Sequence, residues 1–93
     1  YTGTMELNAE LQSSILTRLR RAEGQVRGVQ SMIEDGRDCA DVVAQFAAAI
    51  RALEQAGYKY FAATVQQCAL KPDEAAASGY TTDRLEKLFM QLA

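Results

Sequence analysis

Apolar residues recur every third or fourth position from Leu11 to Ile33, and this spacing constrains the fold more than any other feature. Side chains three and four positions apart share one face of an α-helix, so the pattern predicts a single amphipathic helix. Gly36 follows directly and is suited to a helix C-terminus, so we expect this helix to end near Asp35. The apolar stripe consists of Leu11, Ile15, Leu19, Ala22, Val26, Val29 and Ile33.

A second and longer apolar series follows Asp38. Asp38 can cap a helix N-terminus, and Asp41 adds favourable negative charge in the first turn. Pro72 should end the helix, which then spans about thirty residues or roughly 45 Å. Its apolar positions are Val42, Val43, Phe46, Ile50, Leu53, Gly57, Tyr60, Phe61, Val65 and Cys68.

The remainder of the chain predicts a loop over Asp73–Gly79 and a short third helix. The pattern Asp83-x-x-Glu86 resembles a capping box, and apolar residues follow it at helical spacing. We therefore expect residues 1–93 to form one all-α domain, with two long helices in a hairpin, a short third helix, and a flexible tail over residues 1–9.

A hairpin of this length cannot bury its own apolar surface, because small chains bury only a limited fraction of their surface on folding. Oligomerisation is therefore expected, most simply as an antiparallel four-helix-bundle dimer of two hairpins. The sequence contains no run of 18 apolar residues that would predict a membrane span. It also contains no basic-then-apolar segment that resembles a secretory signal, so a cytoplasmic location is expected.

The chain contains two cysteines and no histidine. Cys39 and Cys68 are 29 residues apart, which corresponds to about 43 Å along one helix. A disulfide requires Cα atoms within roughly 7 Å, so the two thiols either meet between chains or do not act as a pair. Antiparallel packing of two copies of this helix would place Cys39 beside Cys68 of the partner subunit. The alternative is that both are small apolar residues in the core.

The two thiols differ in their expected chemistry. Cys39 lies in the first turn of its helix beside Arg37, where the helix dipole favours a thiolate. Cys68 lies at the opposite end, where the dipole disfavours it. If the pair is reactive, Cys39 should be the attacking nucleophile and Cys68 the resolving partner.

Two sequence blocks carry a family resemblance. Arg18–Gly28 contains R-x-E-G-Q-x-x-G, and Met32–Gln45 contains D-C-x-D-V-x-x-Q, with Cys68 following 29 residues after Cys39. Over roughly Leu16–Cys68, the chain resembles the copper-sensing repressor family, often called CsoR/RcnR/FrmR. The resemblance implies a hairpin dimer that doubles into a homotetramer, represses transcription, and releases operator DNA when its sensor site is filled.

The resemblance also bears on the inducer. Copper sensors of this family use a cysteine, a histidine and a second cysteine, and the matching positions here are Cys39, Thr64 and Cys68. Threonine is a poor copper ligand, so the chain is most similar to the persulfide-sensing, CstR-like branch, which keeps two cysteines. This predicts a redox sensor without metal or cofactor, in which Cys39 and the partner subunit's Cys68 form a disulfide to tetrasulfide bridge after reaction with a persulfide or polysulfide. Cu(I) held by the two thiolates and a formaldehyde-type thiol sensor are the alternatives.

DNA contacts must come from locally clustered basic residues, because 10 basic and 12 acidic residues give a net charge of −2. Arg18, Arg21 and Lys59 are the preferred candidates, with Arg20 and Gln25 as further ones. The alternative for each is a solvated surface charge. Repetition in a tetramer would turn a modest cluster into an extended phosphate-binding surface.

Two other classes of protein explain less of the sequence. A helical adaptor would explain the bundle but neither the paired cysteines nor the family motifs. A thiol-dependent sulfur transferase would use Cys39, but the sequence has no histidine base and no C-x-x-C motif. We therefore expect a repressor and not an enzyme.

Overall fold

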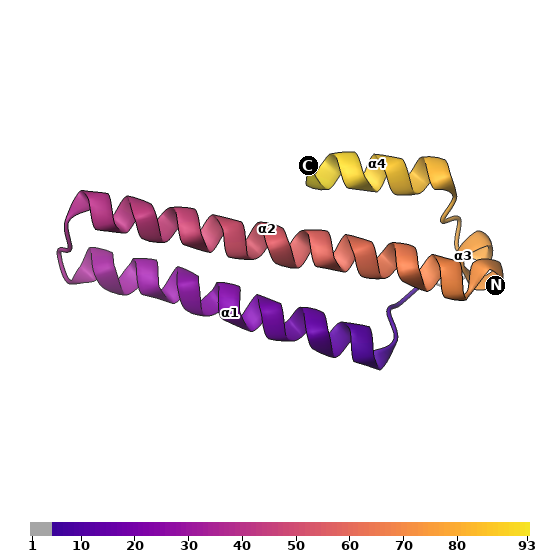
Figure 1. Ribbon diagram of the computed structural model, residues 1–93, viewed down its shortest axis with the longest axis horizontal. Helices are drawn as coiled ribbons and strands as arrows, with labels where there is room; N and C mark the ends of the chain where they lie inside the picture. Colours follow the sequence, from indigo (N-terminus) through magenta and orange to yellow (C-terminus); the bar gives the residue numbers. More distant parts are fainter. Residues whose placement is uncertain (1–4) are drawn as a thin grey trace.

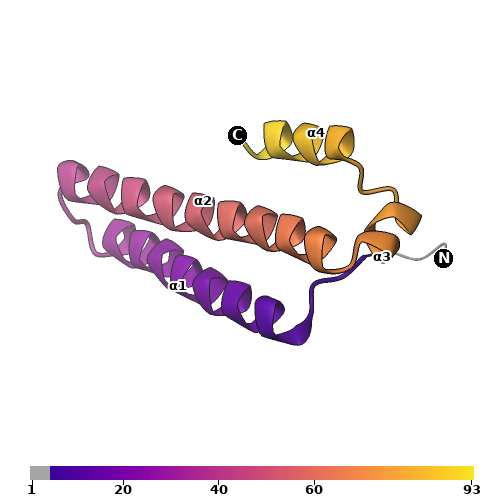
Figure 2. The same cartoon turned by 45° about the vertical axis from the view of Figure 1, so that its right-hand side comes forward.

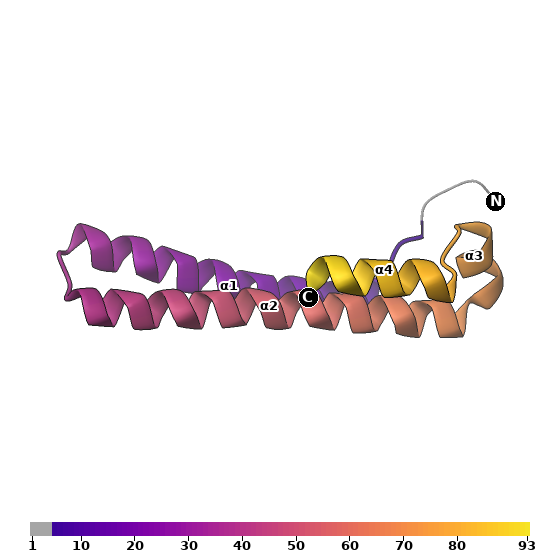
Figure 3. The ribbon, with the colours of Figure 1, turned by 90° about the horizontal axis from the view of Figure 1, so that it is seen from above.

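The computed structural model describes residues 5–93 and is all-helical over that range. Helices α1 (Ala9–Glu34) and α2 (Cys39–Leu70) form an antiparallel hairpin. A short helix α3 (Pro72–Ala77) turns the chain back, and α4 (Thr82–Leu92) lies beside the second half of α2 (Figure 1). The result is an elongated molecule of 54 × 25 × 18 Å (Figure 3), which confirms the predicted all-α hairpin.

The two long helices begin and end where local capping chemistry places them. Asp35 is the C-cap of α1, and Gly36 follows with φ +67°, a conformation that glycine adopts without strain. The side chain of Asp38 accepts a hydrogen bond from the Ala40 amide at 3.1 Å and so caps α2. The predicted turn between the helices is confirmed.

The loop predicted over Asp73–Gly79 was wrong, because most of it is helix α3. Pro72 occupies the first turn of α3, where its missing backbone N–H would have no partner within the helix anyway. The acidic side chains that follow lie at the positive end of the helix dipole. Gly79 ends the turn with φ +80°. The described chain therefore has four helices instead of the three expected, and α4 is capped by Thr81 instead of opening at Asp83.

The hairpin interface is a narrow seam of small side chains. Each helix contributes three buried residues at a spacing of seven, which is the repeat of a two-helix seam. Alanines on α2 allow α1 to approach closely, and aliphatic side chains of α1 fill the space. The seam consists of Ile15, Ala22 and Val29 on α1 and Ala49, Ala56 and Ala63 on α2.

A second apolar face of the hairpin stays exposed. We call it the hairpin stripe, and it consists of Leu19, Val26 and Ile33 on α1 and Phe46, Ile50 and Leu53 on α2. Between 39% and 57% of the surface of each of these residues is exposed, and most of them line one shallow groove between the helices. No described helix combines the length and apolar character needed to cross a bilayer.

The segment before α1 runs to the junction of α2 and α3 (Figure 2). Residues 1–4 of the tail expected over residues 1–9 lie outside the described part of the chain. Beyond them, Leu7 is buried against Ile15 and Ala63, and Asn8 caps α1. Residues 5–8 therefore pack on the hairpin.

Candidate sensor and DNA-binding sites

The single continuous helix α2 carries both cysteines and keeps them apart. Cys39 is its first residue and is exposed, whereas Cys68 lies in its last turn and is half-buried. At about 1.5 Å of rise per residue, their backbones are about 43 Å apart. The two thiols of one chain therefore cannot form a disulfide with each other or share one metal ion.

Both cysteines nevertheless face the same way. At about 100° per residue, Cys39, Thr64 and Cys68 all fall within about 40° of Phe46 around the axis of α2. In the first half of α2 this face carries the hairpin stripe, and in the second half Leu92 of α4 packs on it at Gly57. A second copy packed antiparallel on this face would bring the start of one α2 beside the end of the other.

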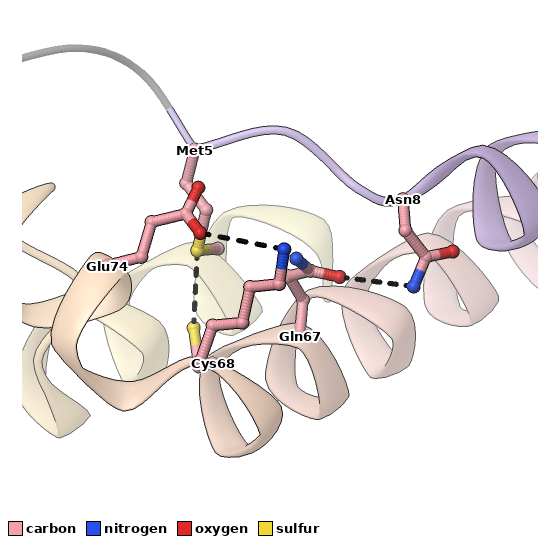
Figure 4. A network of polar contacts seen from close by, with 6 residues as sticks. Met5, Asn8, Gln67, Cys68 and Glu74 are labelled. Carbon is pink, nitrogen blue, oxygen red and sulfur yellow. Dashed lines mark hydrogen bonds and ion pairs between the residues drawn. The ribbon is translucent and has the colours of Figure 1, made fainter.

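The surroundings of Cys68 are shown in Figure 4. Its thiol Sγ lies 3.9 Å from the thioether Sδ of Met5. The neighbouring Gln67 is 2% exposed, and its side-chain oxygen accepts a hydrogen bond from the Asn8 amide at 3.5 Å. Burial raises the pKa of the Cys68 thiol above its ordinary value. Because a metal-binding thiol must first release its proton, any metal affinity at Cys68 should increase with pH.

Thr64 occupies the position of the copper sensors' histidine, one turn before Cys68. Its side chain is buried, and its hydroxyl donates to the Tyr60 carbonyl oxygen of its own helix at 3.0 Å. The hydroxyl is therefore already used within α2. Over residues 5–93, no three His, Cys, Asp or Glu side chains gather into a group that could hold a metal ion.

Two of the predicted DNA contacts lie side by side. Arg18 of α1 and Lys59 of α2 line the same shallow grooves between the helices, together with Ala62. In the described chain, neither side chain forms an ion pair. Their charges are therefore free to contact phosphate.

The remaining predicted contacts lie on α1. Arg20 and Arg21 are exposed and, among the described residues, are not ion-paired. Gln25 instead faces α2, where the Gln45 amide donates to its side-chain oxygen at 2.7 Å and to its backbone oxygen at 3.2 Å. A Cβ added to Gly28 would approach the same Gln45 amide to 3.0 Å. The two motif blocks therefore meet at this contact between the helices.

The contact of Met5 with Cys68 was not predicted from the sequence, because Met5 was assigned to the tail. A signal was present: Asn8 is a favourable N-cap residue, and the apolar Leu7 directly precedes it. Together they indicate that the ordered chain begins before the apolar stripe of α1.

Comparison with known proteins agrees with this architecture. The sequence model of the family described as metal-sensitive transcriptional repressor matches residues 12–91. The chain is 48% identical over 40 residues to the copper-sensing transcriptional repressor CsoR of Bacillus subtilis. It is 56% identical over 36 residues to the copper-sensing transcriptional repressor RicR of Mycobacterium tuberculosis. These matches span 40% and 38% of the two relatives, respectively.

A solved structure covers more of the chain. The crystal structure of the copper-sensing repressor CsoR with Cu(I) from Geobacillus thermodenitrificans superposes with a TM-score of 0.76 and is 35% identical. The superposition covers 97% of this chain and 95% of the other. Sequence and fold therefore agree over nearly the whole chain, which belongs to the family of metal-sensitive transcriptional repressors.

Proposed function

We propose that this repressor responds to Cu(I), which Cys39 of one subunit and Cys68 of its partner hold between them in an antiparallel homodimer. The observation that carries the proposal is the placement of both thiols on one face of α2, at its opposite ends. The proteins to which the chain is similar are named copper-sensing, and one of them was crystallised with Cu(I). Thiolates are soft ligands that suit Cu(I), so the donor set fits the ion.

The hairpin stripe supports the homodimer. Its residues are large and apolar yet 39% to 57% exposed, and an apolar patch of this kind marks an association surface. A twofold axis that passes through the stripe at right angles to α2 would make the two α2 helices antiparallel. It would create two equivalent thiol pairs. Two such dimers would form the homotetramer.

The residues of this chain then act as a switch. Without inducer, nothing links Cys68 to the partner subunit's Cys39, and the helix ends of the two subunits are free to move relative to each other. Cys39 and the partner subunit's Cys68 would together hold the Cu(I) ion and would so be joined across the subunit boundary. If this link fits only one conformation of the dimer, it shifts the population of dimers toward that conformation. We propose that this conformation binds operator DNA weakly. A repressor of this kind acts in the cytoplasm, where the operator is.

A second candidate inducer is a low-molecular-weight persulfide, and Thr64 is the observation that favours it. Its side chain is buried and offers only a hydroxyl oxygen, a hard ligand in place of the histidine nitrogen of the copper sensors, so two thiols remain as the reactive groups. The Cys39 thiolate would take the outer sulfur of the persulfide, giving a Cys39 persulfide and releasing the thiol of the carrier. The thiolate of the partner subunit's Cys68 would then attack the inner sulfur, forming a disulfide and releasing hydrosulfide.

Titration of the DNA complex distinguishes the two inducers. We expect one equivalent of Cu(I) per subunit to weaken operator binding at least about fivefold, the lower range of allosteric coupling, as measured by fluorescence anisotropy. Intact mass spectrometry should then show bound copper and no added sulfur. If glutathione persulfide releases the DNA, Cu(I) does not, and the subunits become covalently linked, then the inducer is a persulfide and not Cu(I). Formaldehyde serves as the control for general thiol reactivity.

The DNA surface is tested by Arg18→Ala and Lys59→Ala. Each should weaken operator binding and reduce the slope of log affinity against log salt by about 0.9 for every subunit that contacts the DNA, since each removes one phosphate contact per subunit. Arg27→Ala is the matched control, because its guanidinium is paired with Glu23 at 3.2 Å. If both test variants keep wild-type affinity and salt slope while the helical circular dichroism is unchanged, DNA binds elsewhere.

A further inference from the structure

We propose that the thioether of Met5 is a third ligand for Cu(I), beside Cys68 and the partner subunit's Cys39. This inference rests on the proposed copper response and adds a residue to its site. Figure 4 shows the observation behind it: the Met5 side chain reaches across to the end of α2, with Sδ 3.9 Å from Cys68 Sγ. The two sulfurs come from residues 63 positions apart, so the fold alone brings them together.

Two anchors hold the Met5 segment in place. Leu7 is 7% exposed and packs in a small cluster with Ile15 and Ala63. Asn8 accepts a hydrogen bond from the Leu11 amide at 3.0 Å and donates one to the buried Gln67 at 3.5 Å. Met5 lies two residues before the first anchor, so its position over Cys68 is set by packing and hydrogen bonds that do not involve either sulfur.

The chemistry of a thioether suits the position. It is a soft, uncharged ligand with no proton to lose, and such sulfur ligands select Cu(I). Thr64, on the same face one turn before Cys68, supplies only a hydroxyl oxygen, a hard ligand that suits Cu(I) poorly. The nearby Glu74 carboxylate is ion-paired with Lys71 at 3.9 Å, and carboxylates are hard ligands that suit other metals better. Met5 therefore supplies the soft donor that this end of α2 otherwise lacks.

Met5→Leu tests the inference, since leucine keeps an apolar side chain of similar size and removes only the sulfur. The matched control is Met90→Leu, on the exposed surface of α4. Loss of an outer-sphere partner already costs about 10–100-fold in metal affinity, so loss of a ligand should cost at least as much. We expect a weakening of this size for Met5→Leu, measured by competition with the chelator bathocuproine disulfonate, and no change for Met90→Leu.

X-ray absorption of the Cu(I) complex supplies a second readout. Copper should have three sulfur neighbours in the wild-type protein and two in Met5→Leu. Met5→His should recover much of the affinity, because imidazole also ligates copper while differing from methionine in shape. Wild-type affinity and an unchanged sulfur count in Met5→Leu would overturn the role of Met5 and leave the two-thiol site intact. A wild-type protein that binds no Cu(I) would overturn the proposed function and this inference together.

Discussion

Replacing Cys68 by serine is expected to abolish the response to Cu(I) while leaving operator affinity in the absence of copper unchanged. Serine is nearly the same size, so the half-buried end of α2 should keep its packing. A hard hydroxyl replaces a soft thiolate, and Cu(I) affinity should fall by at least about 100-fold, the upper range for outer-sphere losses. Cys39→Ser should have the same effect at the exposed start of the helix. Chelator competition and DNA anisotropy measure the two quantities separately.

A Cys68→Ser protein that still releases DNA at one equivalent of Cu(I) would contradict this site. Over residues 5–93, no three His, Cys, Asp or Glu side chains form another group that could hold a metal ion. A loss of Cu(I) binding in this variant would therefore point to the two thiols. Loss of DNA binding before copper is added would instead indicate a structural role for Cys68.

Ile50→Glu is expected to separate the subunits. Ile50 is 55% exposed in the protomer and lies in the hairpin stripe. An unpaired carboxylate buried in a dimer interface costs several kcal/mol, which is on the order of a hundredfold or more in the dimer dissociation constant. A twofold interface contains the substitution twice, which adds to the effect. Sedimentation velocity should show monomers that bind neither operator DNA nor Cu(I) tightly.

The matched control for Ile50→Glu is Ala44→Glu. Ala44 is exposed and lies about 160° from Phe46 around α2, away from the stripe. Ala44→Glu introduces the same charge into the same helix, so any loss of helix stability should be equal in the two variants. If Ile50→Glu keeps the oligomeric mass of the wild-type protein, subunits associate through another surface.

The long helices were predictable from the sequence because their determinants are local. The apolar spacing of α1, the Gly36 terminus and the Asp38 cap each act within a few residues of where they stand. Helix α3 was missed because six residues are too few to show a periodic stripe. Its boundary residues, Pro72 and Gly79, are equally typical of a loop.

The candidate site was predictable only in part. The separation of Cys39 and Cys68 follows from helix length, and their shared face follows from the helical repeat. The contacts of Met5 with Cys68 and of Gln25 with Gln45 join residues 63 and 20 positions apart, and no local pattern specifies them. The presence of two thiols also does not determine which inducer the protein senses. The missing histidine favoured persulfide in the sequence analysis, whereas the similar proteins are copper sensors.

Mixing Cys39→Ser and Cys68→Ser subunits tests the central claim most directly. A dimer with one subunit of each kind keeps one intact pair, Cys39 from one chain and Cys68 from the other, although neither homodimer has any. Co-expression with two different affinity tags would isolate this mixed dimer. We expect it to bind one Cu(I) with wild-type affinity, while both mutant homodimers bind none tightly. Absence of tight Cu(I) binding in the mixed dimer would contradict a sensor site shared between subunits.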